Sequence, residues 1–153
     1  MAKTLIEAAN ILQEMHRGIE GIESAPYLNE YPRGELNRMD LPMVLCYPGP
    51  ANWRNPFGMG CTSEARTWNV IVITADPQQG IGFETLEESL KLIDVMGKNY
   101  NDSSNDVATL SDGDMLLVVN QDYPRDSGFD DEIILGDTVY YGFTFEILVW
   151  RKA

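Results

Sequence analysis

The sequence predicts a single α+β domain over residues 1–153, in which a mostly antiparallel β-sheet carries two main helices on one face. Two stretches have apolar residues at spacings of three and four, as amphipathic helices do, and four others have the apolar pattern of strands. The elements follow the order helix, strand, strand, helix, strand, strand, without a repeat or a linker. The 153 residues suit one hydrophobic core, because a chain of this length buries roughly two-thirds of its unfolded surface.

The first helix is expected from Thr4 to Arg17, with Gly18 and Gly21 ending it. Its apolar side consists of Leu5, Ala8, Ala9, Leu12, Met15 and, just beyond the end, Ile19. His16 is the only histidine of the chain. It lies near the C-terminal end of the helix, where the helix dipole favours a cation, so we expect a structural and not a catalytic role for it.

Two strands follow in the first half of the chain. Residues 27–40, which follow Pro26, contain Pro32, Gly34 and scattered charge, which predict an irregular connection to the apolar strand Leu41–Tyr47. Pro48–Pro50 is expected to end that strand. Residues 66–74 are rich in β-branched side chains and predict a central strand.

A long loop rich in glycine and aromatic residues is expected from Trp53 to Gly60. Exposed rings in such a loop often bind a partner, so Trp53 and Phe57, with Arg54 between them, are candidate contact residues. The alternative, that the two rings fold back over the core as a flap, is equally consistent with the sequence.

The second helix is expected after a turn at residues 76–80. Its apolar side consists of Phe83, Leu86, Leu90, Ile93, Gly97 and Tyr100. Thr85 and Glu88 match the pattern of a capping box and predict the start of the helix there, although Phe83 and Glu84 are also compatible with helix.

The last third of the chain predicts two strands between polar loops. Residues 115–120 form a short apolar strand, and the acidic stretches 99–114 and 122–132 are expected to be loops. Residues 138–150 form the strongest strand pattern of the chain. One of its faces has Tyr141, Phe143, Phe145, Ile147 and Val149, and the other has Tyr140, Thr144, Glu146, Leu148 and Trp150. The second face is also partly apolar, which favours burial against a loop or a neighbouring subunit.

The charge of the chain argues against binding to nucleic acid. Its formal net charge is −13, and residues 77–153 hold 15 acidic against 5 basic side chains. A protein that grips DNA neutralises phosphates with lysine and arginine, which this composition does not supply. A simpler explanation of the excess of acidic residues is that they form a solvated surface and keep the protein soluble. No apolar stretch approaches the length of a membrane span, and the acidic residue Glu7 comes too early for a secretory signal, so we expect a soluble protein made in the cytoplasm.

No catalytic motif is evident. Cys46 and Cys61 lack metal-site spacing, and Gly80–Gly82 is too short for a phosphate-binding loop. We therefore expect neither an enzyme nor a cofactor. A calcium-dependent binding module remains an alternative, because several carboxylates can bind this ion together. The two candidate sets are Asp122, Asp126, Asp130 and Asp131, and Asp102, Asp106, Asp112 and Asp114. Neither set fits an EF-hand, and a hydrolase that uses two carboxylates is the enzymatic version of the same idea.

The order and character of the elements resemble the tail terminator family of tailed bacteriophages, which shares its fold with tail-completion and neck proteins. The resemblance rests on the N-terminal helix, the strand Leu41-Pro-Met-Val, the strand Arg66-Thr-Trp-Asn-Val-Ile-Val-Ile, the second helix and the closing strand Tyr140-Tyr-Gly-Phe-Thr-Phe-Glu-Ile-Leu-Val. It covers nearly the whole chain and implies a virion protein that forms a ring, usually a hexamer, between the tail tube protein and the head-tail connector.

The resemblance and the exposed aromatics together suggest contact residues. Candidates for contact with a neighbouring subunit or another partner are Trp53, Arg54, Phe57, Arg66, Tyr140 and Trp150. The long loops 49–60 and 99–114 are the segments expected to reach the partners, and Trp53→Ala or Arg54→Glu is expected to abolish assembly. A different head-tail connector or neck subunit is the nearest alternative. In a ring, the acidic charge would let DNA pass through the lumen without sequence-specific binding.

Overall fold

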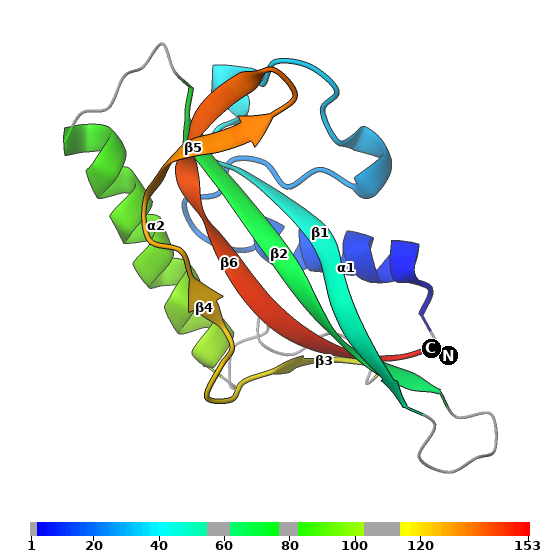
Figure 1. Ribbon diagram of the computed structural model, residues 1–153. Coiled ribbons are helices and arrows are strands. Elements are labelled where there is room, and N and C mark those ends of the chain that lie inside the picture. The colour runs from blue at the N-terminus through cyan, green and yellow to red at the C-terminus, as the bar shows by residue number, and fades with distance from the viewer. Residues whose placement is uncertain (1–2, 55–61, 77–82, 103–113) are drawn as a thin grey trace.

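A computed structural model describes residues 3–54, 62–76, 83–102 and 114–153. It confirms the predicted fold class, since two helices cover one face of a six-stranded sheet in which every strand pair is antiparallel. The elements are α1 (Leu5–Arg17), β1 (Met43–Arg54), β2 (Ser63–Ala75), α2 (Phe83–Asn101), β3 (Met115–Val118), β4 (Arg125–Asp126), β5 (Asp130–Leu135) and β6 (Thr138–Lys152), with short 3-10 helices at Leu28–Glu30 and Arg38–Asp40. Figure 1 shows the long strands β1, β2 and β6 side by side.

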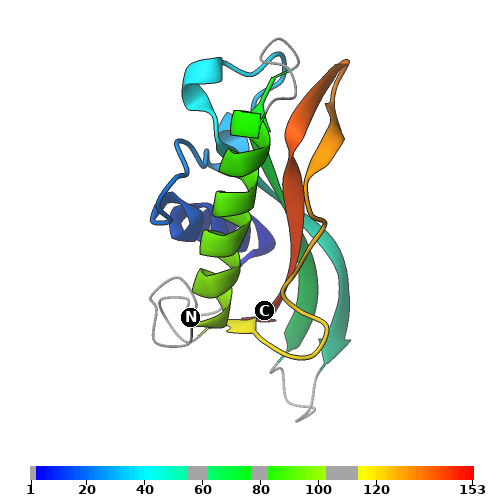
Figure 2. The ribbon, with the colours of Figure 1, turned by 90° about the vertical axis from the view of Figure 1, so that its left-hand side faces the viewer.

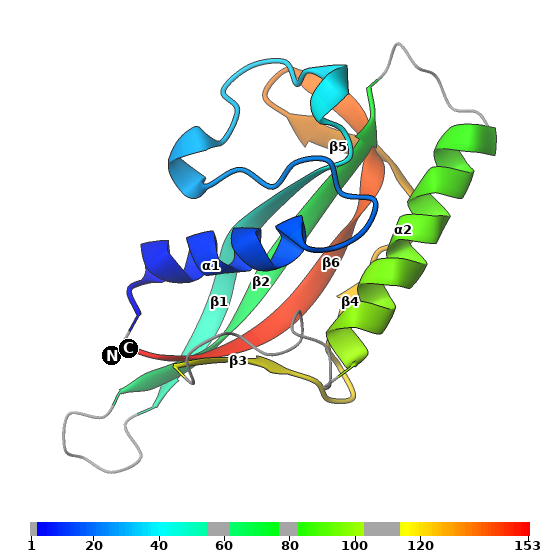
Figure 3. The same ribbon diagram turned by 180° about the vertical axis from the view of Figure 1, so that it is seen from behind.

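The sheet is organised around β6, which pairs with β2 on one side and with β3, β4 and β5 in turn on the other. Among the named strands of the described chain β1 pairs with β2 alone and forms one edge, where Ser24 adds a single parallel bridge to Met43. Seen from the side in Figure 2, both helices lie on the same side of the sheet, and Figure 3 shows them in front of the strands. The face that they cover is here called the helix face, and the opposite one the second face.

Helix α1 begins with a capping box. The Thr4 side chain accepts a hydrogen bond from the backbone N–H of Glu7, and the Glu7 carboxylate accepts one from the backbone N–H of Thr4. Of the two starts left open for the second helix, the earlier one is confirmed: α2 begins at Phe83 and places Thr85 inside its first turn, so a start at the Thr85–Glu88 capping box is wrong. The same Thr-x-x-Glu pattern marks a true helix start only where the chain before it is extended, as Thr4 is.

The prediction that Pro48–Pro50 ends the first strand is wrong. β1 continues to Arg54 through a shift in register between Pro48 and Ala51. Proline lacks the backbone N–H of the ladder, which an edge strand tolerates at a bulge. Side chains of β2 bind the bulge, since Arg66 donates to the carbonyl of Gly49 and Thr67 to that of Pro50.

The stretch 122–132 is not wholly a loop, as predicted, because β4 and the start of β5 fall within it. The closing strand is confirmed and runs two residues further, to Lys152. At Gly142 it lies so close to β2 that a Cβ would overlap the carbonyl oxygen of Val72. Only glycine therefore fits this position without moving one of the two strands.

Two groups of buried side chains form the core. The larger lies between the helices and the sheet and includes Leu12, Trp68, Val70, Met96, Tyr100, Phe143, Phe145 and Ile147. The smaller lies on the second face at one end of the sheet and consists of Leu36, Met43, Leu45, Ile73, Ile133 and Tyr140. Tyr31 and Leu41, from the connection before β1, pack against this smaller group. The second face is thus covered at one end.

Candidate subunit interface

Four of the six candidate contact residues meet at one end of the sheet. In the register of β1, β2 and β6, Arg54 lies opposite Ser63, and Trp150 lies opposite Ala65. Trp53, opposite Glu64, and Arg66, opposite Val149, lie in the neighbouring rows and therefore on the other face. Trp53 and Arg54 belong to β1 and not to the expected loop, and Phe57 lies outside the described residues.

Tyr140 is wrongly assigned as a contact residue. It is 1% exposed, lies near the opposite end of β6 and packs in the smaller core group. Its hydroxyl accepts a hydrogen bond from the backbone N–H of Leu36, so that the ring anchors the connection that covers the second face. Alternation along β6 assigned Tyr140 to the second face correctly, but the residues that cover that face come from far away in the sequence.

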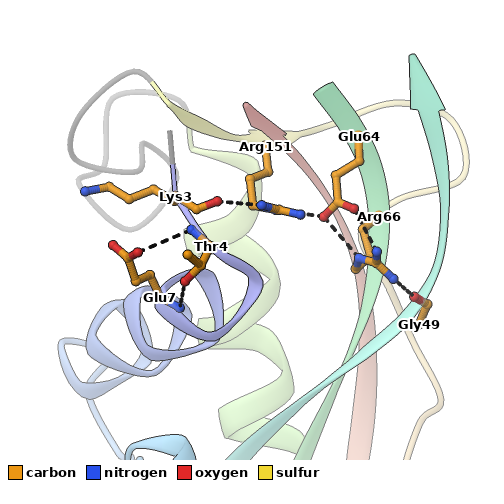
Figure 4. A network of polar contacts seen from close by, with 7 residues as sticks. All are labelled: Lys3, Thr4, Glu7, Gly49, Glu64, Arg66 and Arg151. Carbon is orange, nitrogen blue, oxygen red and sulfur yellow. Dashed lines mark hydrogen bonds and ion pairs between the residues drawn. The ribbon is translucent and has the colours of Figure 1, made fainter. Parts of the chain in front are cut away.

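A buried ionic network lies on the helix face at the same end of the sheet (Figure 4). The Glu64 carboxylate accepts hydrogen bonds from Arg66, at 3.0 and 2.7 Å, and from Nε of Arg151, at 2.9 Å. Arg151 also donates to the carbonyl of Lys3 at 2.5 Å, and its guanidinium lies 5.6 Å from the centre of the Trp53 ring. The network therefore connects the start of the chain, the β1–β2 hairpin and the end of β6.

Hydrogen bonding outweighs desolvation at Glu64. Burial by itself would raise the pKa of this carboxyl, but the hydrogen bonds and positive charges of Arg66 and Arg151 lower the pKa below its usual value. An ionised carboxylate that accepts three hydrogen bonds from two guanidinium groups, and whose pKa is lowered by them, is a poor general base. The arrangement indicates a structural role, in which it fixes the end of the sheet.

The second face at this end is apolar and has no cover among the described residues. The pairing of β3 with β6 places Trp150 beside Leu116 and, two rows further on the same face, Leu148 beside Val118. Leu116 is 49% exposed, and the other three are half-buried. These four residues, Leu116, Val118, Leu148 and Trp150, are here called the sheet-face strip. Sequence reasoning found only Trp150 as a contact, because the partners of a short strand such as β3 cannot be read from its own pattern.

His16 is buried as a neutral side chain, so the expectation of a cation at the end of α1 is wrong. Its Nδ1 donates to the carbonyl of Leu12 at 2.6 Å, and its Nε2 accepts from the Tyr100 hydroxyl at 2.5 Å. Burial lowers the pKa of His16 to about 4, although the hydrogen bond to Leu12 acts in the opposite direction. The group lies wholly inside the core and joins α1 to α2.

The acidic loops do not converge where the structure describes them. The carboxylate of Asp126 accepts from the backbone N–H of Gly128, and that of Asp130 accepts from the backbone N–H of Glu132. Within the described residues no group of three or more acidic, histidine or cysteine side chains is placed to hold a metal ion. Asp106 and Asp112 of the other acidic set lie outside these residues. The helices of the described part are also too short or too polar to cross a membrane.

Comparison with known proteins assigns the chain to no family. No protein-family model matches the sequence, and no curated protein matches it either. The features of the chain that bear on its function are therefore the sheet-face strip, the charges around it and the order of the elements.

Proposed function

We propose that this chain is a ring-forming structural subunit of a phage tail, a terminator that caps the tail tube and joins it to the head connector. The observation that carries the proposal is the sheet-face strip. Within the part of the chain that the structure describes, no segment covers this end of the second face, and it leaves apolar surface in water, which monomeric proteins generally avoid. A neighbouring copy in a closed ring would cover it.

Two further features agree with a structural role. The charged network at this end of the sheet fixes the strands on which the strip lies, and a rigid surface loses less entropy on assembly than a mobile one. The net charge of −13 suits a ring through which DNA passes, because a negative lumen repels phosphates. Neither feature requires a substrate or a cofactor.

The mass of the protein in solution tests the proposal. Light scattering coupled to size exclusion, over a range of concentrations, is expected to give a species of about six times the 17.2 kDa of one chain, alone or in equilibrium with the monomer. Negative-stain electron microscopy of that species should show a closed ring with a central opening. A chain that stays monomeric at the highest concentration, or that forms only open filaments, would contradict the proposal.

A calcium titration in the same buffer separates this function from a calcium-dependent module. A ring subunit is expected to keep its melting temperature when calcium is added, whereas a protein that binds calcium only when folded is stabilised by it. A rise in melting temperature that follows the calcium concentration and is reversed by a chelator would favour the module.

A further inference from the structure

The free edge of β1 is closed over its first half. The backbone N–H of Val44 donates to the carbonyl of Ser24 at 2.9 Å, and the carbonyl of Val44 accepts from the Gln13 side chain at 2.8 Å. The Tyr31 hydroxyl accepts from the N–H of Cys46 at 2.9 Å and donates to the carbonyl of Cys46 at 2.7 Å. Other parts of the chain thus occupy the positions at which a further strand would pair with β1.

The second half of the same edge is open. Val44 lies opposite Val72, so alternation along β2 turns the backbone groups of Val72, and of every second residue down to Glu64, toward β6. Ala51 and Trp53 lie opposite two of these residues and therefore direct their own N–H and C=O groups away from the sheet. These groups make no hydrogen bond with another described residue, and Trp53 is 54% exposed. Figure 3 shows this end of the β1–β2 hairpin extending away from both helices.

The outer side of β3 is the other edge of the sheet at this end. The N–H of Lys152 donates to the carbonyl of Asp114, so every second residue from Asp114 onward faces β6. Leu117, and Val119 just past the end of β3, alternate with those positions and direct their backbone groups outward, where they make no hydrogen bond with another described residue. Val119 is 50% exposed, whereas Met115 is fully buried, so the open part of this edge begins at Leu117.

We propose that the open half of the β1 edge in one copy pairs with the open edge of β3 in the next copy, so that one sheet continues across the subunit boundary. Trp53 exchanges backbone hydrogen bonds with Leu117 in this pairing, and Ala51 with Val119. The inference rests on the function proposed above and names the contact through which the subunits of the ring meet.

The direction of the strands favours a second copy as the partner. The order at this end of the sheet is β1, β2, β6 and β3, and each strand is antiparallel to the next, so β1 and β3 run in opposite directions. Copies related by rotation in a ring keep the direction of their strands, so β1 of the next copy meets β3 as an antiparallel partner. The unit of four strands therefore repeats without a break in the antiparallel order, and closure of the ring removes both open edges.

The side chains along the two edges suit this pairing. Trp53 lies beside Leu117 on the helix face, and Arg54 lies beside Leu116 on the second face. Arg54 makes no ion pair with a described residue, so its aliphatic part is free to cover Leu116 while its guanidinium stays in water. The neighbouring copy thus covers the outer flank of the sheet-face strip.

A pairing of two β1 edges around a twofold axis is the alternative. It also satisfies the backbone groups of Ala51 and Trp53, but it leaves the β3 edge open and ends at a dimer. The experiments below distinguish the two contacts.

Proline at the outward positions tests the hydrogen bonds of the contact. Trp53→Pro removes an N–H that makes no bond within the described chain, which an edge strand tolerates, whereas Trp53→Val removes the ring and keeps the N–H. The proline variant is expected to self-associate at least roughly tenfold more weakly than the valine variant in light scattering. Val119→Pro against Val119→Thr gives the same comparison at the β3 edge. Equal association within each pair, with all four variants folded by circular dichroism, would overturn the proposal.

A disulfide between copies tests the register without the use of proline. Asn52 and Val118 lie opposite one another in the proposed pairing, as a pair without mutual hydrogen bonds, whose Cα atoms are about 4.5 Å apart and suit a disulfide. In a chain that carries Cys61→Ser, Asn52→Cys and Val118→Cys are expected to form a covalent dimer on mild oxidation only when the two variants are mixed. Met39→Cys mixed with Val118→Cys is the control, because Met39 is 81% exposed, lies on neither edge and should give no dimer. A dimer of Asn52→Cys alone would show two β1 edges paired and would overturn the proposal.

The outcomes separate this inference from the proposed function. If the wild type forms closed rings and the proline variants still do, with no disulfide between Asn52→Cys and Val118→Cys, the inference fails and the function stands. If the disulfide forms as expected but the wild type gives only open chains, the contact stands and the terminator function fails. If the wild type never associates, both fail.

Discussion

The two faces of the same sheet differ in what covers them. On the helix face, α1 and α2 bury a continuous layer of large side chains, including Trp68, Phe143 and Phe145, together with the neutral His16 and the ionised Glu64. On the second face, the described residues cover one end, and the other end presents Leu116 at 49% exposure. The difference indicates that the helix face determines stability, whereas the open end of the second face is available for association.

The largest expected effect comes from truncation on the helix face. Phe143→Ala should lower the free energy of unfolding by about 4 kcal/mol in urea denaturation, because the fully buried ring leaves a cavity between sheet and helices. A decrease in the free energy of unfolding of no more than about 1 kcal/mol would contradict the view that the helix face determines stability.

Removal of the buried charge at Glu64 comes next. Glu64→Gln leaves the guanidinium groups of Arg66 and Arg151 without a counter-charge in a buried place and should cost about 3 kcal/mol by the same measurement. Glu146→Gln is the matched control on the second face, since Glu146 pairs with the exposed Arg125, and it should change the stability little. Similar losses in both variants would mean that burial of the ion pair does not matter.

Acid should destabilise the helix face in two separate ranges of pH. The pKa of His16 is lowered by burial from 6.5 to about 4, so protons bind the unfolded chain more strongly. Stability is complete above pH 6.5 and falls as the pH drops, by about 2 kcal/mol between pH 7 and pH 5. The pKa of Glu64 is lowered in the folded state, so its contribution is present above the usual glutamate pKa and is lost only at lower pH.

Urea denaturation at pH 7 and at pH 5 checks the role of His16. The difference in stability between the two pH values should shrink in His16→Gln, which has no group that titrates there, and should remain in Glu64→Gln. An unchanged difference in His16→Gln would show that another group is responsible.

The smallest effect is expected at the open end of the second face. Leu116→Thr introduces a β-branched side chain, which suits a strand, at a half-exposed position and should change the free energy of unfolding of the monomer by less than about 0.5 kcal/mol. The measurement is made at low protein concentration, so that the monomer is observed. A decrease in the free energy of unfolding as large as that of Phe143→Ala would show that this end belongs to the core of the monomer.

Local patterns predicted the elements well, and failed where distant parts of the chain decide. The spacing of apolar residues located both helices and the strands around residues 44, 70 and 145, because periodicity depends on neighbours within a few residues. It did not reveal that β1 continues past Pro48, since that depends on β1 being an edge strand with side chains of β2 at its bulge. The pattern also assigned Tyr140 to a contact surface. Tyr140 is instead buried by Leu36, which lies 104 residues earlier in the chain.

The candidate site was predictable in part. Trp150 and Arg54 were identified from exposed aromatics and charge, but Glu64, Arg151 and Leu116 were not. Glu64 and Arg66 alternate correctly to share one face of β2, a pattern that suggests a paired charge. Arg151 lies 87 residues beyond Glu64, and only the register of β2 against β6 brings the two together.

The sequence by itself determined that the chain forms two amphipathic helices and a sheet with an apolar face, because hydrophobic periodicity states which side of each element avoids water. It also determined the acidity of the surface, which needs no structure to count. Only the tertiary structure decided which element covers which apolar side, since a pattern gives a side but not its neighbour. That is why the strip at Leu116 and Trp150, uncovered within the described chain, becomes visible only once both helices are seen on the other face of the sheet.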